Sequence, residues 1–222
     1  MNGTPNQVQF EAIANQLSCP TGEAGLKTAE NMAANNENMI STTIDSLNLQ
    51  SGDAVLEIGP GSGTHVFNVF AKADGLNYCG VDISELMVTE AVKNNEGPVS
   101  KGNAIFYLSD GQKLAFEANS FDKLFTVNTL YFWNDPVAYA KEIFRVLKPG
   151  GTFCLCFAPK EFMEKLPFTG YIFKLYTLAE TEAILFSAGF SILKSELHNE
   201  VVKTLAGEAV ERNFIVITCT AP

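Results

Sequence analysis

The chain has 222 residues, 46% of them apolar and 18% charged, which is enough to build a buried core and excludes a disordered protein. Its 25 acidic and 15 basic residues give a net charge of −10, which disfavours nucleic acids and anionic membrane surfaces as partners. Five cysteines without a C-x-x-C pair and only two histidines predict neither a disulfide framework nor a metal site.

The first residues lack the basic and apolar regions of a secretory signal, and the apolar runs are too short to span a bilayer. We therefore expect a cytoplasmic protein without membrane insertion, either a monomer or a homodimer. Residues 1–50 are expected to form an N-terminal helical extension or cap. A break at Cys19-Pro20-Thr21-Gly22 interrupts this extension, and its apolar residues recur at helical spacing: Met32, Met39, Ile40, Ile44 and Leu47.

From residue 51 to 222 we expect one domain in which strands and helices alternate. Ser84 and Asp135-Pro136 are predicted helix starts. The expected strands are short apolar runs that end in glycine or polar residues, at 54–58, 77–81, 104–108, 121–127 and 152–157. This alternation predicts an α/β fold with a doubly wound, Rossmann-like sheet.

The last quarter of the chain departs from this alternation. Residues 190–198 and 214–220 read as two further strands, joined by a polar stretch without a helical pattern. They are expected to form an antiparallel pair at one edge of the sheet. The complete sheet would then have seven strands, mostly parallel, with one antiparallel edge strand.

The predicted site starts with the glycines of Gly59-Pro60-Gly61-Ser62-Gly63, which follow the first strand and precede a helix expected near Thr64. Glycine permits a sharp turn and lets a ligand approach the backbone, and free N–H groups at a helix start attract anions. A purely structural turn is the alternative. A dinucleotide fingerprint requires a third glycine at position 64, where this chain has Thr64.

Acidic residues follow the next two strands. Asp82 is placed to accept hydrogen bonds from ribose hydroxyls, unless it only caps the helix that begins after Ser84. Asp110 is placed to accept from an adenine amino group, unless Asp110-Gly111 is an ordinary turn. In an open parallel sheet these strand ends meet at one edge, so a shared nucleoside site is the favoured interpretation.

Taken together, these segments resemble the motifs of class I S-adenosylmethionine-dependent methyltransferases, in the small-molecule group that includes the ubiquinone/menaquinone-type enzymes. The first motif is carried by residues 55–63 and the second by Val81-Asp82-Ile83-Ser84. Residues 108–116 resemble the adenine-contacting segment, residues 121–131 the fourth-strand motif, and residues 145–151 the turn into the fifth strand. The resemblance covers roughly residues 50–160 and does not identify the substrate.

The resemblance implies S-adenosylmethionine as the cofactor and a role for each matching residue. Gly59, Gly61 and Gly63 would pack against its methionine part, with Glu57 holding the loop from beneath. Asp82 would bind the ribose, while Ile83 and Met87 line the adenine. Asp110, with Gly111 beside it, would accept a hydrogen bond from the adenine amino group, and Asn128 would reach the methionine end of the cofactor.

Methyl transfer from a sulfonium is an in-line displacement, so the chain need not carry an obvious catalytic residue. His65 and Tyr131 are weak candidates, and a structural role is the alternative for each. Aromatic residues around 131–133 and 160–176 suggest an apolar pocket for a small apolar or aromatic metabolite, with 160–176 as a substrate cap. Two other interpretations stay open: a non-catalytic protein that binds S-adenosylmethionine or S-adenosylhomocysteine, and an NAD-dependent oxidoreductase.

Overall fold

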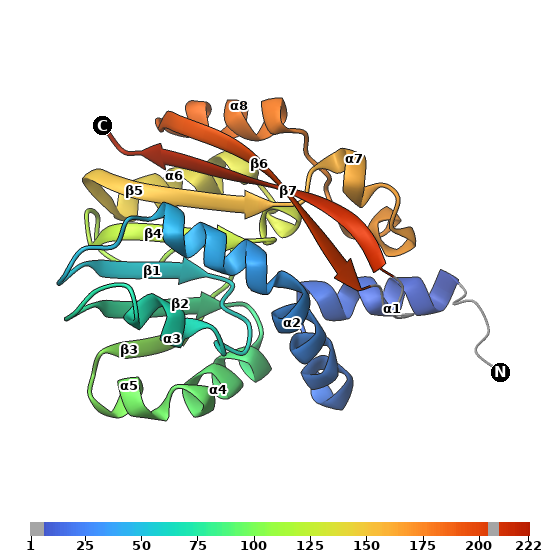
Figure 1. Ribbon diagram of the computed structural model, residues 1–222, viewed down its shortest axis with the longest axis horizontal. Helices are drawn as coiled ribbons and strands as arrows, with labels where there is room; N and C mark the ends of the chain where they lie inside the picture. The colour runs from blue at the N-terminus through green and yellow to red at the C-terminus, as the bar shows by residue number, and fades with distance from the viewer. Residues whose placement is uncertain (1–6, 204–208) are drawn as a thin grey trace.

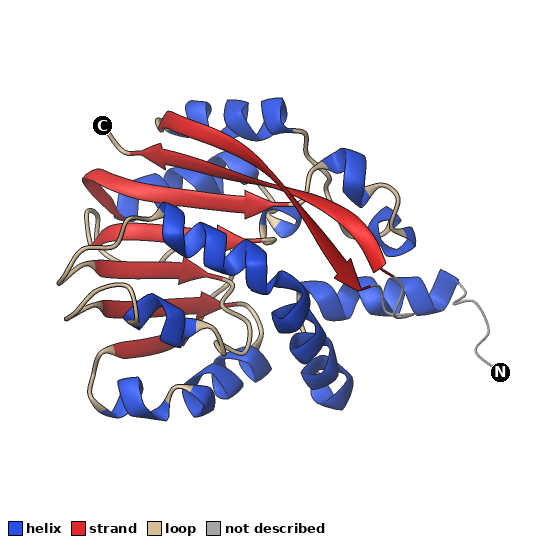
Figure 2. Ribbon diagram, in the orientation of Figure 1, coloured by secondary structure: helices blue, strands red, loops and turns tan. Residues whose placement is uncertain are grey.

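The computed structural model describes residues 7–203 and 209–222, and they form one seven-stranded sheet with helices on both faces (Figures 1 and 2). The strand order is β3-β2-β1-β4-β5-β7-β6, so the predicted doubly wound α/β sheet is confirmed. The strands are β1 Ala54–Ile58, β2 Asn77–Asp82, β3 Ala104–Leu108, β4 Phe121–Val127, β5 Leu147–Phe157, β6 Ser191–Lys203 and β7 Ala209–Thr220.

The two helix starts predicted from the sequence are capped by side chains. Ser84 accepts a hydrogen bond from the Met87 N–H at the start of α4, and Asp135 accepts one from the Ala138 N–H at the start of α6. The helices are α1 Gln7–Ser18, α2 Gly22–Ser46, α3 Val66–Phe70, α4 Glu85–Asn94, α5 Glu96–Ser100, α6 Pro136–Val146, α7 Lys160–Met163 and α8 Leu178–Ala188, with single 3-10 turns η1 Leu130–Phe132 and η2 Pro167–Gly170.

Strands β1 to β5 run parallel, so their carboxyl ends meet at one edge of the sheet. β1 lies between β2 and β4, and the strand order therefore reverses at β1. A crevice opens beyond the strand ends at such a reversal, and it is the usual ligand site of open α/β sheets. This position is where the segments after β1, β2, β3 and β4 converge.

The predicted antiparallel pair is present at the other side of the sheet. β7 is the strand of opposite direction and lies second from the edge, between β5 and the outermost β6. Both strands are longer than expected, because much of the polar stretch 199–213 continues the pairing: Val202 still pairs with Val210. The centre of that stretch, 204–208, lies outside the described residues. Residues 209–214 of β7 pair only with β6, and this part of the two strands forms a projecting arm (Figure 1).

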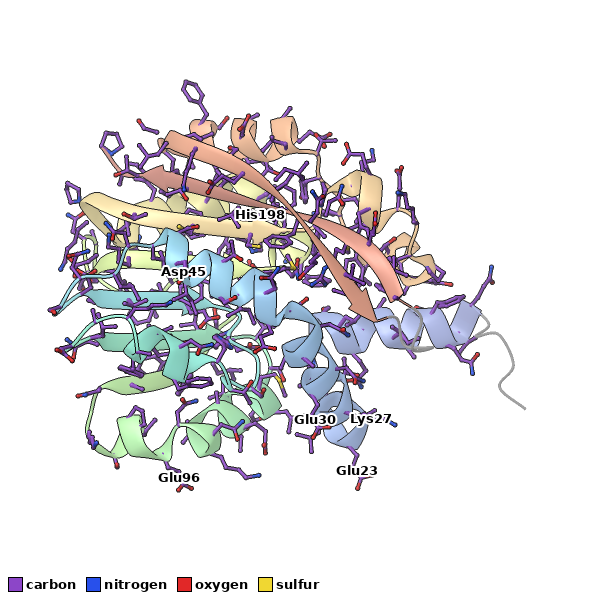
Figure 3. All side chains as sticks on the ribbon, viewed as in Figure 1. Glu23, Lys27, Glu30, Asp45, Glu96 and His198 are labelled. Carbon is purple, nitrogen blue, oxygen red and sulfur yellow. The ribbon has the colours of Figure 1, made fainter. Side chains whose placement is uncertain are left out.

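The two faces of the sheet carry separate apolar layers. The second half of α2 packs its Ile40 and Ile44 on one face, next to residues of α3 and α4. α6 and α8 pack together on the opposite face. The first half of α2 leaves the sheet, and Figure 3 shows its Glu23, Lys27 and Glu30 pointing into solvent. In the same half, Met32 and Ala33 line the crevice beyond the strand ends.

The N-terminal residues 1–6 lie outside the described residues. α1 contacts both α2 and η2, so the first helix rests on part of the 160–176 segment. Along residues 7–203 and 209–222, no helix combines the length and apolar character needed to cross a membrane.

Candidate active site

The glycine turn after β1 is held in a left-handed backbone conformation. Gly59, Gly61 and Gly63 have φ angles of 74°, 56° and 66°, which other residues adopt only with strain. A Cβ on Gly59 would lie 2.5 Å from the Thr129 methyl group, whereas a Cβ on Gly61 would meet nothing within 4 Å. The turn is therefore packed at its start and open in its middle. The helix expected near Thr64 begins two residues later, with α3.

A buried carboxylate lies beneath this turn. Glu57 is 2% exposed, both of its oxygens lie 2.9 Å from His65 Nε2, and it also accepts from the Tyr78 hydroxyl. Burial disfavours the imidazolium, but the charge and the hydrogen bond of Glu57 together outweigh burial and raise the pKa of His65. The Glu57–His65 pair thus ties the end of β1 to the residue that precedes α3.

Asp82 at the end of β2 joins two loops. Its Oδ2 accepts from the Gly61 N–H at 3.0 Å and its Oδ1 from the Ser84 N–H at 2.9 Å. The residue is only 8% exposed, and burial raises the pKa of its carboxyl in spite of these hydrogen bonds. Asp82 therefore contacts the start of α4, as the capping interpretation requires, and also the glycine turn.

The segment after β3 forms the turn that Asp-Gly predicts. Asp110 Oδ1 accepts from the Gln112 and Lys113 N–H groups at 2.8 and 2.9 Å, and these donors lower the pKa of its exposed carboxyl. Gly111 has a φ of 68°, and a Cβ there would lie 3.1 Å from the Ile83 side chain. The two segments that were expected to contact adenine therefore pack closely against each other.

One cavity of about 510 Å³ connects these segments. Every predicted cofactor residue except Gly63 lines it, and so does His65: Glu57, Gly59, Gly61, Asp82, Ile83, Met87, Asp110, Gly111 and Asn128. Gly63 packs instead against α4, where a Cβ would lie 3.1 Å from Ala91. The structure thus gathers at one site residues that are up to 71 positions apart in the chain.

Asn128 and Tyr131 follow β4, but they differ in position. Asn128 lines the cavity with both ends of its amide engaged, as Oδ1 accepts from the Tyr131 hydroxyl at 3.1 Å and Nδ2 lies 3.4 Å from Met39 Sδ. Tyr131 is 2% exposed and does not line the cavity, which favours the structural role that was the alternative for this weak candidate. Its hydroxyl is 2.9 Å from Ala158 O and accepts from the Ala158 N–H, and burial raises its pKa far above the usual value. This tyrosine joins β4 to β5.

Two further parts of the wall were not predicted residue by residue. The N-terminal helices contribute Leu17, Ser18, Pro20, Ala29, Met32, Ala33, Asn36 and Ile40, and the segment after β4 and α6 contribute Thr129, Phe132, Trp133, Asn134 and Tyr139. The helix break at Pro20 is the one local signal for the first group. Its carbonyl accepts from Ser84 Oγ at 2.6 Å, which places the α1–α2 turn beside Asp82.

The predicted substrate cap 160–176 supplies no lining residue among those described. It supports the wall from outside instead: the Phe173 ring is 4.8 Å from that of Phe132, and Lys174 Nζ donates to Asn134 O at 2.8 Å. In the part of the chain that the structure describes, no cluster of three or more His, Cys, Asp or Glu is arranged to hold a metal ion.

The comparisons with known proteins agree with this geometry. Residues 56–155 match the methyltransferase domain family. The chain is 32% identical over 130 residues to an uncharacterized methyltransferase, YdaC, of Bacillus subtilis. The alignment covers 59% of this chain and 70% of YdaC. The matched range includes the predicted cofactor residues from Glu57 to Asn128.

Solved structures share the fold at low sequence identity. The methyltransferase in complex with the Trm112 methyltransferase activator of Haloferax volcanii superposes with a TM-score of 0.74 at 19% identity, over 97% of both chains. Phosphoethanolamine N-methyltransferase 2 of Haemonchus contortus, solved with phosphomonomethylethanolamine and S-adenosylhomocysteine, gives 0.68 at 18% identity. That match covers 96% of this chain and 60% of the other. The chain belongs to the methyltransferase type 11 family of class I S-adenosylmethionine-dependent methyltransferases, which act on small molecules.

Proposed function

We propose that this methyltransferase acts on an uncharged, apolar or aromatic small molecule, by in-line displacement at the cofactor's methyl group. The observation that carries the proposal is the character of the cavity wall away from the glycine turn. It is formed by aliphatic and aromatic side chains of α2, of the end of β4 and of the segment after β4, with Met32, Ile40, Val127, Phe132 and Trp133 among them. Binding an apolar molecule against such a wall removes apolar surface from water, which favours binding.

The opposite end of the cavity fits S-adenosylmethionine. Gly61 leaves open space above the backbone of the turn, which allows the methionine part to approach closely. Asp82 uses one lone pair of each oxygen on a backbone N–H, which leaves both oxygens able to accept from ribose hydroxyls.

The bound cofactor supplies an activated methyl group, so the residues of this chain mainly align the acceptor and exclude water. Neither of the two cavity residues with a titratable ring is suited to act as a general base. His65 is paired with Glu57, and burial raises the pKa of the Tyr139 hydroxyl far above neutrality. We therefore expect an acceptor atom that is already nucleophilic, or one whose proton leaves to solvent.

A phosphorylated acceptor does not suit this wall. The described lining residues include no Lys or Arg, while three carboxylates, Glu57, Asp82 and Asp110, face the same cavity. A phosphate group carries nearly two negative charges and is normally bound by arginines, lysines or several N–H donors. In this respect we expect the chain to differ from the phosphoethanolamine N-methyltransferase whose fold it shares.

The test is an assay with S-adenosylmethionine labelled on its methyl group and a cell metabolite extract. The extract is divided by anion exchange into neutral and phosphorylated fractions, and the labelled product is identified by mass. We expect label in the neutral fraction together with release of S-adenosylhomocysteine, and neither with an Asp82→Ala control. Label in the phosphorylated fraction would contradict the proposed acceptor class. Cofactor binding without release in any fraction would favour a non-catalytic binding protein.

A further inference from the structure

The projecting arm of β6 and β7 carries a buried ion pair next to the cavity wall. Glu200 on β6 is directly opposite Arg212 on β7, and their side chains are 9% and 10% exposed. Arg212 Nε donates to Glu200 Oε1 at 2.7 Å. Removing two charges from water is costly unless the remaining donors and acceptors are also satisfied. The partners of this pair should therefore be fixed in position.

The partners of the ion pair belong to α2, which is more than 160 positions away in the chain. Arg212 Nη1 donates to Asn36 Oδ1 at 3.0 Å, and Nη2 donates to the Asn35 carbonyl. Glu200 Oε2 accepts from Asn38 Nδ2 at 3.1 Å. In Figure 1 the free end of the arm lies next to the middle of α2, and Figure 3 labels His198 near the base of the arm.

These contacts fix which way the Asn36 amide points. A guanidinium has only donors, so the atom that faces Arg212 must be the amide oxygen. The amide nitrogen of Asn36 has no acceptor among the described residues, and the side chain lines the cavity. Asn36 also lies one helical turn from Met32 and one from Ile40, which line the same cavity. It is therefore a polar interruption in an apolar stripe.

The other asparagines of the wall are arranged differently. Both ends of the Asn128 amide are engaged, with Tyr131 and with Met39. Asn134 is largely exposed to solvent. Asn36 alone of these three combines a half-buried position with an oriented amide and an unused donor.

We propose that Asn36 Nδ2 selects methyl acceptors that carry a hydrogen-bond-accepting oxygen, such as a carbonyl or ether, and that Arg212 is the positioning residue that turns the donor toward the cavity. The inference rests on the proposed function, because it assumes that the apolar wall covers the acceptor. An acceptor without such an oxygen would bury the donor unpaired, and an unpaired buried donor costs more than a hydrogen bond gains.

The test compares two small probes of similar shape, acetophenone and ethylbenzene, by equilibrium dialysis against the full chain saturated with S-adenosylhomocysteine. Acetophenone has an accepting oxygen and ethylbenzene has none. We expect Asn36→Leu to shift the ratio of the two Kd values toward ethylbenzene by roughly 2- to 10-fold, the range for one neutral hydrogen bond. Asn36→Asp keeps the Arg212 contact but replaces the donor by an acceptor, and it should also weaken acetophenone binding.

Arg212→Met tests the positioning role, because it leaves Asn36 in place but frees its amide to rotate. It should move the Kd ratio in the same direction as Asn36→Leu, with circular dichroism and S-adenosylhomocysteine affinity as checks of folding. A ratio that stays at the wild-type value in both Asn36 variants overturns the assignment of Asn36 and leaves the proposed function standing. If the wild-type chain retains neither probe, the apolar acceptor cavity itself is wrong, and the inference falls with it.

Discussion

Substitution of Gly59 by alanine gives a sharp test of how the cofactor turn is packed. The added Cβ would lie 2.5 Å from Thr129 Cγ2, well inside contact distance. Thr129 has little freedom to turn away, because its hydroxyl lies 2.6 Å from Thr126 Oγ1 and accepts from Trp133 Nε1 at 3.1 Å. The backbone φ of 74° adds a penalty of its own for any residue with a Cβ.

These two costs can be estimated separately. A left-handed conformation costs a non-glycine residue about 1–2 kcal/mol. Overpacking in a well-filled site costs about 1–3 kcal/mol. Gly59→Ala should therefore lower the free energy of unfolding by roughly 2–5 kcal/mol. Gly150→Ala is the matched control: its φ is 76° but a Cβ there meets nothing within 4 Å, so only the first cost applies.

A second substitution isolates the clash. Thr129→Ser removes the offending methyl group but keeps the hydroxyl and its hydrogen bonds. In the Gly59→Ala background it should recover about 1–3 kcal/mol, the overpacking part of the loss. Urea unfolding of the single and double variants measures each difference. If Gly59→Ala is no less stable than Gly150→Ala, or if Thr129→Ser recovers nothing, the packing argument is wrong.

Three further predictions concern polar groups of the site. Asp82→Asn should weaken S-adenosylmethionine binding roughly 10- to 100-fold in calorimetry, as loss of a charge-assisted hydrogen bond predicts; unchanged affinity would remove Asp82 from the proposed ribose contact. Because the folded chain raises the pKa of His65 through Glu57, the stability from this pair is complete below the ordinary value of 6.5 and is lost as pH rises through the raised value. His65→Gln should flatten that part of the stability–pH curve, and a difference that is independent of pH would contradict the pairing. Tyr131→Phe should cost about 1–3 kcal/mol of stability by leaving the Ala158 N–H unpaired, with kcat unchanged; a large fall in kcat with stability intact would restore Tyr131 as a catalytic candidate.

The cofactor half of the site could be predicted because its signals are local. Each segment follows directly after a strand, and the glycine spacing, Asp82 and Asp110-Gly111 are visible within short stretches of sequence. The fold places strand ends together, so a correct strand assignment was sufficient to bring these residues into one cavity. Gly63 shows where this reasoning ends: the same pattern gives no sign that it packs on α4 rather than facing the cavity.

The acceptor half could not be predicted in the same way, because its contacts join distant parts of the chain. The stretch 199–213 looks like a polar connection, since Glu200, Glu211 and Arg212 interrupt its apolar pattern. In the structure Glu200 and Arg212 pair across the arm and face α2, so their partners lie outside any local window. The role of Tyr131 stayed open for a related reason, because nothing in the sequence shows that its hydroxyl bonds to Ala158.

The arm has a consequence for exchanging parts between relatives. The N-terminal helices form one wall of the cavity, and the last portion of the chain supports this wall from outside through the contact of Arg212 with Asn36. A graft of the N-terminal helices alone would bring a new wall residue without the guanidinium that turns it. A chimera that changes acceptor preference should therefore transfer α1–α2 and β6–β7 as a matched set, while the central segment with the glycine turn is left in place.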